Sequence, residues 1–203
     1  RYLARMQPDI VHFHDDLLWP QLLTLGPRRW KTVIHAHGGG TAQPQPLKTR
    51  LMYACQRRYA DAVVCITEEA RSSQIRNVDF RPGLATVLYN GVDADHFQPA
   101  TPARRAEARA RLGLRNSDPV VGFVGRLHDA MKGCRDFLEV FALLPAAFQG
   151  LVAGGGPDAP VLHAYARELG IADRIRFVGL LDDPLPAYQA MSVFCFVSRY
   201  EPF

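Results

Sequence analysis

The chain has 203 residues, of which 48% are hydrophobic and 22% charged, with a net charge of +4. This is an ordinary globular balance, with enough apolar material for one large domain or two small ones. The basic residues are scattered without an aromatic-basic stripe, so the composition does not favour a nucleic-acid-binding protein, and we expect no nucleic acid among the partners.

The cysteine spacing and the length of the apolar runs indicate the cellular compartment of the protein. Cys55, Cys65, Cys134 and Cys195 lie far apart, with no C-x-x-C pair. This spacing favours neither a disulfide framework nor a zinc site, and therefore indicates a reducing cytoplasm. We find no apolar run of membrane-spanning length and no signal peptide. The chain begins without an initiator Met and stops directly after an expected strand, so we expect a piece of a longer protein.

In the first half of the chain, short apolar runs alternate with helical patterns. Thr67, with two glutamates directly after it, is a typical helix N-cap. Strands are expected at residues 10–14, 31–37, 62–66 and 85–89, and helices near 17–25, at 47–59 and from Thr67 to about residue 76.

Between Asp93 and Ser117 the composition shifts to Pro, Ala and Arg, which is typical of a connector and a lead-in helix. The basic face of that helix is most simply solvated, and attraction to a membrane surface or an acidic acceptor is the second interpretation. The alternation then resumes. Strands are expected at 120–124, 150–153, 174–178 and 193–197, and helices at 133–144, 159–169 and 185–190.

Strands that alternate with helices through short loops form parallel sheets built of βαβ units. The break near residue 93 divides these units into two groups. We therefore predict an α/β fold of two partial Rossmann-like domains with parallel sheets, covering residues 1–94 and 95–203.

Two cations frame the loop after the expected strand at 120–124. Arg126 follows the strand, and Lys132 precedes the next expected helix. In an open α/β sheet, ligands bind at the carboxyl ends of the strands, where helix-start N–H groups favour anions. Arg offers phosphate oxygens a rigid fork and Lys a mobile charge. The pair suggests a diphosphate pocket, against the ordinary alternative of two solvated charges.

A glycine-rich turn, residues 154–157, follows the expected strand at 150–153. Glycines in such a turn let a ligand or a neighbouring backbone approach closely, and Pro157 suits an early helical position. Because strand-to-helix turns are often glycine-rich for steric reasons alone, the steric explanation is the more frequent one.

Four histidines form two same-face pairs, since residues two apart in a strand project to one side. His12 and His14 lie in one expected strand, and His35 and His37 in the next. Zinc sites built wholly from strand histidines are uncommon, and no acidic cluster accompanies these, so we predict no metal. We favour instead a single substrate contact by His37 at the edge of a crevice, with His12 and His35 also suited to a buried structural role.

Glu201 follows the apolar run 193–197, which is expected to be a buried strand. In a parallel sheet its carboxylate would face the same crevice as Arg126 and Lys132. Carboxylates accept hydrogen bonds from sugar hydroxyls. The alternative is an exposed loop glutamate.

Together, these segments resemble the retaining glycosyltransferases of family 4 (glycosyl transferases group 1), over nearly the whole chain and in the family's order. The resemblance implies the GT-B fold, in which two Rossmann-like domains face each other. The similar segments are PDIVHFH, TVIHAHG, ADAVVCITEEARSSQ, VLYNGVDADHF, GRLHDAMKG, GLVAGGGPD and IRFVGLLDDPLPAYQAMSVFCFVSRYEPF.

The resemblance implies roles for the candidate residues. Arg126 and Lys132 match the pair that binds the donor diphosphate. Glu201 matches the first glutamate of the E-x7-E motif, which contacts the donor sugar. His37 matches the acceptor-domain histidine near the reacting sugar carbon.

The nucleotide would occupy two further segments. The turn Gly155-Gly156-Pro157 matches one that lines the nucleotide site. The segment with Arg174, Ile175 and Phe177 matches one whose backbone reads the base. The family needs no metal or organic cofactor.

Three departures from the family pattern qualify the resemblance. The gap from Arg126 to Lys132 is six positions, one longer than the common spacing, so the loop is expected to be reshaped. The second glutamate of E-x7-E and the opening βαβ unit would lie outside residues 1–203. We therefore expect this stretch to be inactive by itself.

The resulting hypothesis is a cytoplasmic glycosyltransferase that moves a hexose from a UDP- or GDP-sugar to a saccharide or lipid-linked acceptor, with retention. The basic balance permits peripheral association with the inner face of a membrane without requiring it. Alternatives are a sugar phosphorylase or nucleotide-sugar epimerase of the same fold, or a non-catalytic sugar- or nucleotide-binding module. A dinucleotide-dependent oxidoreductase is disfavoured because no G-x-G-x-x-G follows the first strand.

Overall fold

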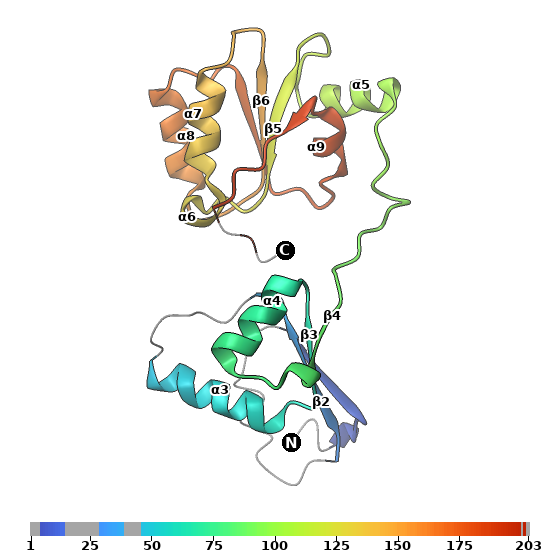
Figure 1. Cartoon of the computed structure of the whole chain (residues 1–203). Helices are drawn as coiled ribbons and strands as arrows, with labels where there is room; N and C mark the ends of the chain where they lie inside the picture. Colours follow the sequence, from blue (N-terminus) through green and yellow to red (C-terminus); the bar gives the residue numbers. More distant parts are fainter. Residues whose placement is uncertain (1–4, 15–28, 39–45, 200, 202–203) are drawn as a thin grey trace. The chain divides into compact units, whose positions relative to one another are not determined.

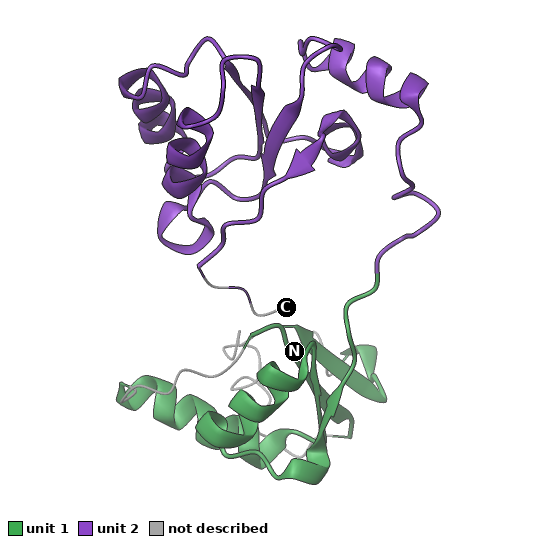
Figure 2. Ribbon diagram, turned by 45° about the horizontal axis from the view of Figure 1, so that its top comes forward, with its two compact units in different colours: residues 1–91, 202–203 green, residues 92–201 purple. Residues whose placement is uncertain are grey.

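The computed structural model describes residues 5–14, 29–38, 46–199 and 201, so the helix expected near 17–25 lies outside the described residues. The chain folds into two compact units, which divide after Gly91 (Figure 2). Each unit contains a four-stranded parallel sheet with helices beside it (Figure 1). The predicted α/β class with two parallel sheets is therefore confirmed.

Unit 1 contains the first sheet, in which the strands follow one another in chain order. Its strands are β1 (Ile10–His14), β2 (Lys31–Ala36), β3 (Ala62–Cys65) and β4 (Ala85–Val87). Its helices are α3 (Leu47–Tyr59) and α4 (Glu68–Ser73), followed by a π-helical turn (Gln74–Val78) and a 3₁₀ turn (Pro82–Leu84).

The core of unit 1 lies on one face of its sheet, where alternate residues of β2 and β3 meet the helices. Ile34 and Val63 pack there with Tyr53 of α3 and Ala70 of α4. The Thr67 side chain accepts a hydrogen bond from the Ala70 N–H at 3.0 Å and caps α4, as predicted. The α-helix is shorter than expected, because the chain changes to the π-helical turn after Ser73.

Unit 2 contains the second sheet, in the order β7-β6-β5-β8. Its strands are β5 (Val120–Val124), β6 (Gln149–Ala153), β7 (Ile175–Gly179) and β8 (Val193–Phe194). Its helices are α5 (Pro102–Arg111), α6 (Asp129–Lys132), α7 (Cys134–Ala142), α8 (Ala159–Glu168) and α9 (Leu185–Ala190).

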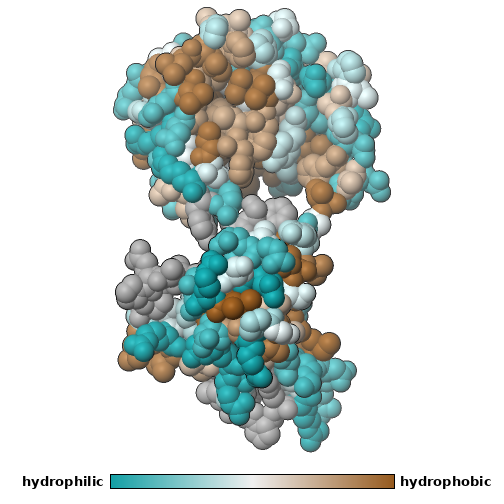
Figure 3. Space-filling model, in the orientation of Figure 1, coloured by the Kyte–Doolittle hydropathy of each residue, from teal (hydrophilic) through white to brown (hydrophobic). Residues whose placement is uncertain are grey.

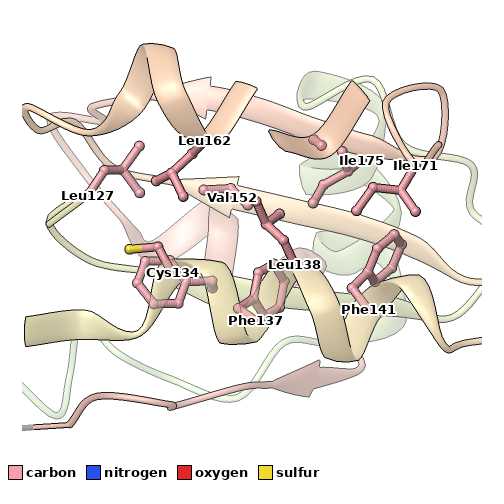
Figure 4. Close-up of a cluster of buried hydrophobic side chains, with 11 residues drawn as sticks. Leu127, Cys134, Phe137, Leu138, Phe141, Val152, Leu162, Ile171 and Ile175 are labelled. Carbon is pink, nitrogen blue, oxygen red and sulfur yellow. The ribbon is translucent and has the colours of Figure 1, made fainter. Parts of the chain in front are cut away.

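Helices cover both faces of this sheet, with α7 and α8 on one side and α5 and α9 on the other (Figure 1). On the first side, Phe137 and Phe141 of α7 pack against Leu162 of α8 and Ile175 of β7 (Figure 4). All five residues of β6 are buried. A strand covered on both faces is apolar throughout, which is why residues 150–153 read as a continuous apolar run.

The last expected strand, 193–197, is corrected by the structure. Only Val193 and Phe194 form β8, and these two side chains are 55% and 41% exposed. β8 is the outermost strand of the sheet among the described residues, so no further strand covers its outer side. Apolar surface is visible on unit 2 in Figure 3. Among the described helices, none has the length and apolar character that a bilayer crossing requires.

Candidate functional site

Lys132 and Glu201 meet in unit 2, although they are 69 positions apart in the chain. The Lys132 Nζ donates a hydrogen bond to Glu201 Oε1 and forms an ion pair with it. The two side chains are only 24% and 21% exposed. Burial opposes ionisation of Glu201, but hydrogen bonds from Lys132 and Ser198 and the Lys132 charge together lower its pKa. The structure therefore brings together two of the predicted site residues.

The segment that carries Glu201 is fastened to the start of α7. The Arg199 guanidinium contacts both carboxylate oxygens of Asp136 at 2.7 Å, and the Arg199 N–H donates to the Met131 carbonyl at 2.9 Å. Gly133, which joins α6 to α7 with φ +63°, packs against the backbone at the amino end of this segment, where an added Cβ would be 2.4 Å from the Val197 oxygen. These contacts place Glu201 beside Lys132.

The sequence did not predict α6, which contains Lys132 and is joined to α7 by Gly133. Lys132 is the last residue of this four-residue helix rather than the opening of the next one. One N–H group at the start of α7, that of Arg135, already donates to Asp129 Oδ1 at 2.7 Å. Asp129 thus already occupies one of the N–H groups that could bind an anion at this helix start.

The three glycines of the glycine-rich turn differ in how closely neighbouring atoms approach them. Gly154 and Gly156 pack backbone to backbone against the loop after β5, since a Cβ on them would lie 1.8 Å from the Gly125 oxygen and 2.3 Å from the Leu127 oxygen. The Leu127 N–H donates to the Gly155 carbonyl at 2.9 Å across the same seam. Gly155 itself has room for a Cβ, with the nearest atom of Leu180 at 3.6 Å. The steric explanation therefore accounts for two of the three glycines.

A pocket of about 430 Å³ opens at the carboxyl ends of β5, β6 and β7. This volume is in the range of small-molecule sites, and the location is where open α/β sheets bind ligands. Arg126 and Gly155, two of the predicted site residues, lie in its wall. The lining residues are Val124, Gly125, Arg126, Ala153, Gly154, Gly155, Leu180, Leu181 and Pro184.

Arg126 is exposed, and its guanidinium makes no hydrogen bond or ion pair with any other described residue of the chain. The structure thus places Arg126 in the pocket and Lys132 in the ion pair with Glu201, and no contact between described residues joins the arginine to that pair. A guanidinium without a protein partner remains available to an anionic ligand.

The segment expected to read a base does not line this pocket. Arg174 precedes β7 and donates to the Leu144 and Pro145 carbonyls at 3.1 and 2.9 Å, and Ile175 is buried in the core. Phe177 stacks on His163 of α8, with ring centroids 4.1 Å apart. None of the three lines the pocket, because two of them lie at the amino end of a parallel strand and the third packs under a helix.

The pocket is lined instead by residues that directly follow β7. Leu180 and Leu181 follow Gly179, which ends β7 with φ +74°. A glycine at the end of a strand, followed by apolar residues in a loop, is the signal in the sequence that could have identified them. Of the other predicted nucleotide-binding residues, Gly156 packs against Leu127 and Pro157 precedes α8, and neither lines the pocket.

His37 lies in unit 1, directly after β2, together with the other three histidines of the two strands. His14 Nδ1 and His37 Nε2 are 2.9 Å apart, at hydrogen-bond distance. His14 and His35 are cross-strand neighbours in the register of β1 and β2. The same-face arrangement expected from the sequence is therefore confirmed.

Known families match both halves of the chain. Residues 1–96 match Glycosyltransferase Family 4, and residues 118–203 match Glycosyl transferases group 1. The chain belongs to this glycosyltransferase family. Within it, the chain is 31% identical over 219 aligned residues to the 2-deoxystreptamine glucosyltransferase of Streptomyces kanamyceticus, covering 97% of this chain and 55% of the relative. It is 32% identical to the D-inositol 3-phosphate glycosyltransferase of Corynebacterium diphtheriae, covering 93% and 48%.

Solved structures of glycosyltransferases share the fold of this family member. The structure of Anabaena Alr3699/HepE in complex with UDP and glucose matches with a TM-score of 0.87 at 21% identity, covering all of this chain and 56% of that one. The glycosyltransferase WaaG matches with a TM-score of 0.75 at 18% identity, covering 99% and 56%. The predicted GT-B class is confirmed. The chain spans about half the length of the relatives it matches.

Proposed function

We propose that the protein is a glycosyltransferase that uses a UDP- or GDP-hexose donor and that unit 2 binds this donor. The hexose passes to a saccharide or lipid-linked acceptor with retention at the anomeric carbon. The observation that carries the proposal is the pairing of Lys132 with Glu201 in a chain of this family. A cation that can hold a diphosphate and a carboxylate that can hold sugar hydroxyls then lie next to each other.

The two cations have complementary roles in this proposal. A lysine ammonium has three N–H donors. One of them is used by Glu201, so two remain for phosphate oxygens. Arg126 has no protein partner among the described residues and supplies a fork for a second set of oxygens. Both charges stabilise the negative charge that grows on the leaving diphosphate when the bond to the sugar breaks.

The pocket beside Arg126 suits the nucleoside. Gly155 leaves space on one wall, and Leu180, which is 82% exposed, offers apolar surface on the other. Such surface favours the face of a base, which loses water when it packs there. The HepE complex with UDP and glucose supports a uridine nucleotide as the first to be tested.

For the sugar itself we propose two contacts. Glu201 accepts hydrogen bonds from hydroxyl groups of the donor hexose, which its lowered pKa favours because the carboxylate stays ionised. His37 contacts the hexose near its anomeric carbon. The hydrogen bond between His14 Nδ1 and His37 Nε2 occupies one nitrogen of this ring, so Nδ1 is the atom that remains for the sugar.

Calorimetric titration with UDP and with GDP tests the donor site on this chain. We expect binding of at least one of them, and a loss of about tenfold or more in affinity for Lys132→Ala, because a hydrogen bond to a charged group contributes about 1.5–3 kcal/mol. Arg167→Ala is the matched control, since it removes an exposed positive charge from the last turn of α8. Unchanged affinity in Lys132→Ala, or an equal loss in Arg167→Ala, would contradict the assignment.

Product analysis in the full-length protein distinguishes transfer from the alternatives. With a UDP-hexose and an acceptor, a transferase forms a glycoside and UDP. An epimerase changes the hexose without an acceptor, a phosphorylase requires inorganic phosphate, and a binding module leaves the donor intact. The anomeric configuration of the product, measured by NMR, tests retention.

A further inference from the structure

Four imidazole rings gather on one face of the sheet of unit 1, and we call His12, His14, His35 and His37 the histidine cluster. One ring nitrogen from each of His12, His14 and His35 lies within 4.8 Å of the others. His12 and His35 stack with their planes 5° apart and their centroids 5.3 Å apart. Such crowding of four titratable rings is costly if more than one of them is protonated.

The backbone imposes this crowding. β1 and β2 are parallel, and His14 lies directly opposite His35 in their register. Neighbouring strands are about 4.8 Å apart, and residues two apart in a strand share a face. The backbone therefore places all four histidines on one face of the sheet, where their rings contact one another.

We propose that His12, His14 and His35 bind one Zn²⁺ or a similar late first-row divalent ion, each through one imidazole nitrogen. Neutral imidazole is a preferred ligand of these ions, and a site with three histidines leaves a fourth position for water or a substrate oxygen. Zn–N bonds of about 2.0–2.1 Å require the three nitrogens to approach one another further. His12 and His14 are exposed and can rotate inward, whereas the buried His35 is the fixed ligand.

His37 is suited to support this site from outside. Histidines that bind a metal almost always donate their other ring N–H to a fixed partner, which sets the tautomer. The proposal requires the tautomer in which His14 Nδ1 donates to His37 Nε2, which lies 2.9 Å away, because the lone pair on His14 Nε2 is then left for the ion.

The proposed metal site differs from the expectation of no metal drawn from the sequence, which rested on the rarity of such sites, on the lack of an acidic cluster and on the family resemblance.

Titration of the tag-free chain with Co²⁺ alone, after removal of metals by a chelator, tests the proposal through the visible absorption of the cobalt complex. We expect one equivalent to bind and Zn²⁺ to displace it. His12→Gln and His14→Gln should each abolish the band, and His37→Gln should weaken binding by about 10–100-fold, as loss of a supporting partner does. His163→Gln, on α8 of unit 2, is the matched control and should bind as the wild type does.

A second measurement on the wild-type chain keeps the test independent of folding in the variants. In ¹⁵N NMR spectra, Zn²⁺ should shift imidazole signals of three histidines of the cluster and leave those of His96, His128 and His163 unchanged. Absence of binding, binding that survives in His12→Gln and His14→Gln, or shifts confined to histidines outside the cluster would overturn the proposal. No nucleotide is present in either experiment, so its result is independent of the donor assignment.

Discussion

Replacing Gly133 by Ala should destabilise unit 2 and separate Lys132 from Glu201. Gly133 has φ +63°, and an ideal Cβ built on it lies 2.4 Å from the carbonyl oxygen of Val197. The obstructing atom belongs to the backbone of the segment that leads to Glu201, so it cannot rotate away as a side chain would. Relief of the overlap requires the segment to move away from the turn that carries Lys132.

Two contributions set the size of the loss in free energy of unfolding. A residue with a Cβ in the left-handed conformation costs about 1–2 kcal/mol. Overpacking that forces a backbone shift typically costs about 1–3 kcal/mol more. We therefore expect Gly133→Ala to lose about 2–5 kcal/mol, with the larger values applying if the Arg199–Asp136 ion pair also breaks.

Two other glycines of unit 2 separate these contributions. Gly113 and Gly170 have φ +69° and +67°, and a Cβ on either meets no atom within 4 Å. Gly113→Ala and Gly170→Ala should therefore lose only the conformational contribution of about 1–2 kcal/mol. The excess loss in Gly133→Ala then measures the overlap with Val197.

The assay is urea unfolding of the whole chain followed by circular dichroism, combined with titration of each variant with UDP. Gly133→Ala should weaken UDP binding, while Gly113→Ala and Gly170→Ala should bind as the wild type does. If all three variants lose the same stability, the close packing of Gly133 on the Glu201 segment is refuted. If Gly133→Ala is destabilised but binds UDP normally, the Lys132–Glu201 pair is not part of the donor site.

Three further predictions follow from the same packing and charges. Phe137→Ala, at a side chain 1% exposed, should lose about 3–5 kcal/mol of stability in thermal or urea unfolding. The native pKa of Glu201 lies below its ordinary value of 4.5, so its ion pair stabilises the fold above that pH and loses this effect as the pH falls through the native pKa. The stability difference between wild type and Glu201→Gln, about 1 kcal/mol or less at neutral pH, should disappear over that acid range. Gly155→Ala should retain stability but weaken UDP binding, whereas Gly156→Ala should unfold more easily because its Cβ meets the Leu127 carbonyl.

The strands and helices of unit 2 were predictable because a sheet that is buried on both faces requires continuous apolar runs in its strands and apolar residues at helical spacing in the helices that cover it. β6 is buried throughout and the apolar residues of α7 recur at helical spacing, so both elements were located within a few residues. β8 was predicted too long, since an apolar run alone does not reveal that a strand is at the edge of the described sheet. The four-residue helix α6 was missed, because it depends on tertiary contacts of Asp129 with Arg135 and Arg199.

The candidate site was predictable to the extent that it depends on topology. Lys132 and Glu201 both follow strands of a parallel sheet, and the carboxyl ends of such strands lie on one edge. The same rule places Arg174 and Ile175, at the start of β7, at the opposite edge of the sheet from the pocket. Leu180, which follows β7, is at the same edge of the sheet as the pocket.

The glycine-rich turn shows what sequence reasoning cannot separate. A ligand and a neighbouring backbone both favour glycine where they approach closely, so the three consecutive glycines fitted either explanation. Only the position of the loop after β5 distinguishes them, since Gly154 and Gly156 lie against it and Gly155 does not.

The Lys132–Glu201 pair is held by contacts that no ligand supplies. One side depends on Gly133 and its packing against Val197, and the other on the bidentate contact of Arg199 with Asp136. If unit 2 binds the proposed donor at this pair, the ammonium and the carboxylate lose little further conformational entropy on binding, because these contacts already fix both backbones. A diphosphate that takes up the two remaining N–H groups of Lys132 then adds to an arrangement already formed, and the affinity for nucleotide should depend on Gly133 and Arg199 nearly as much as on Lys132 itself.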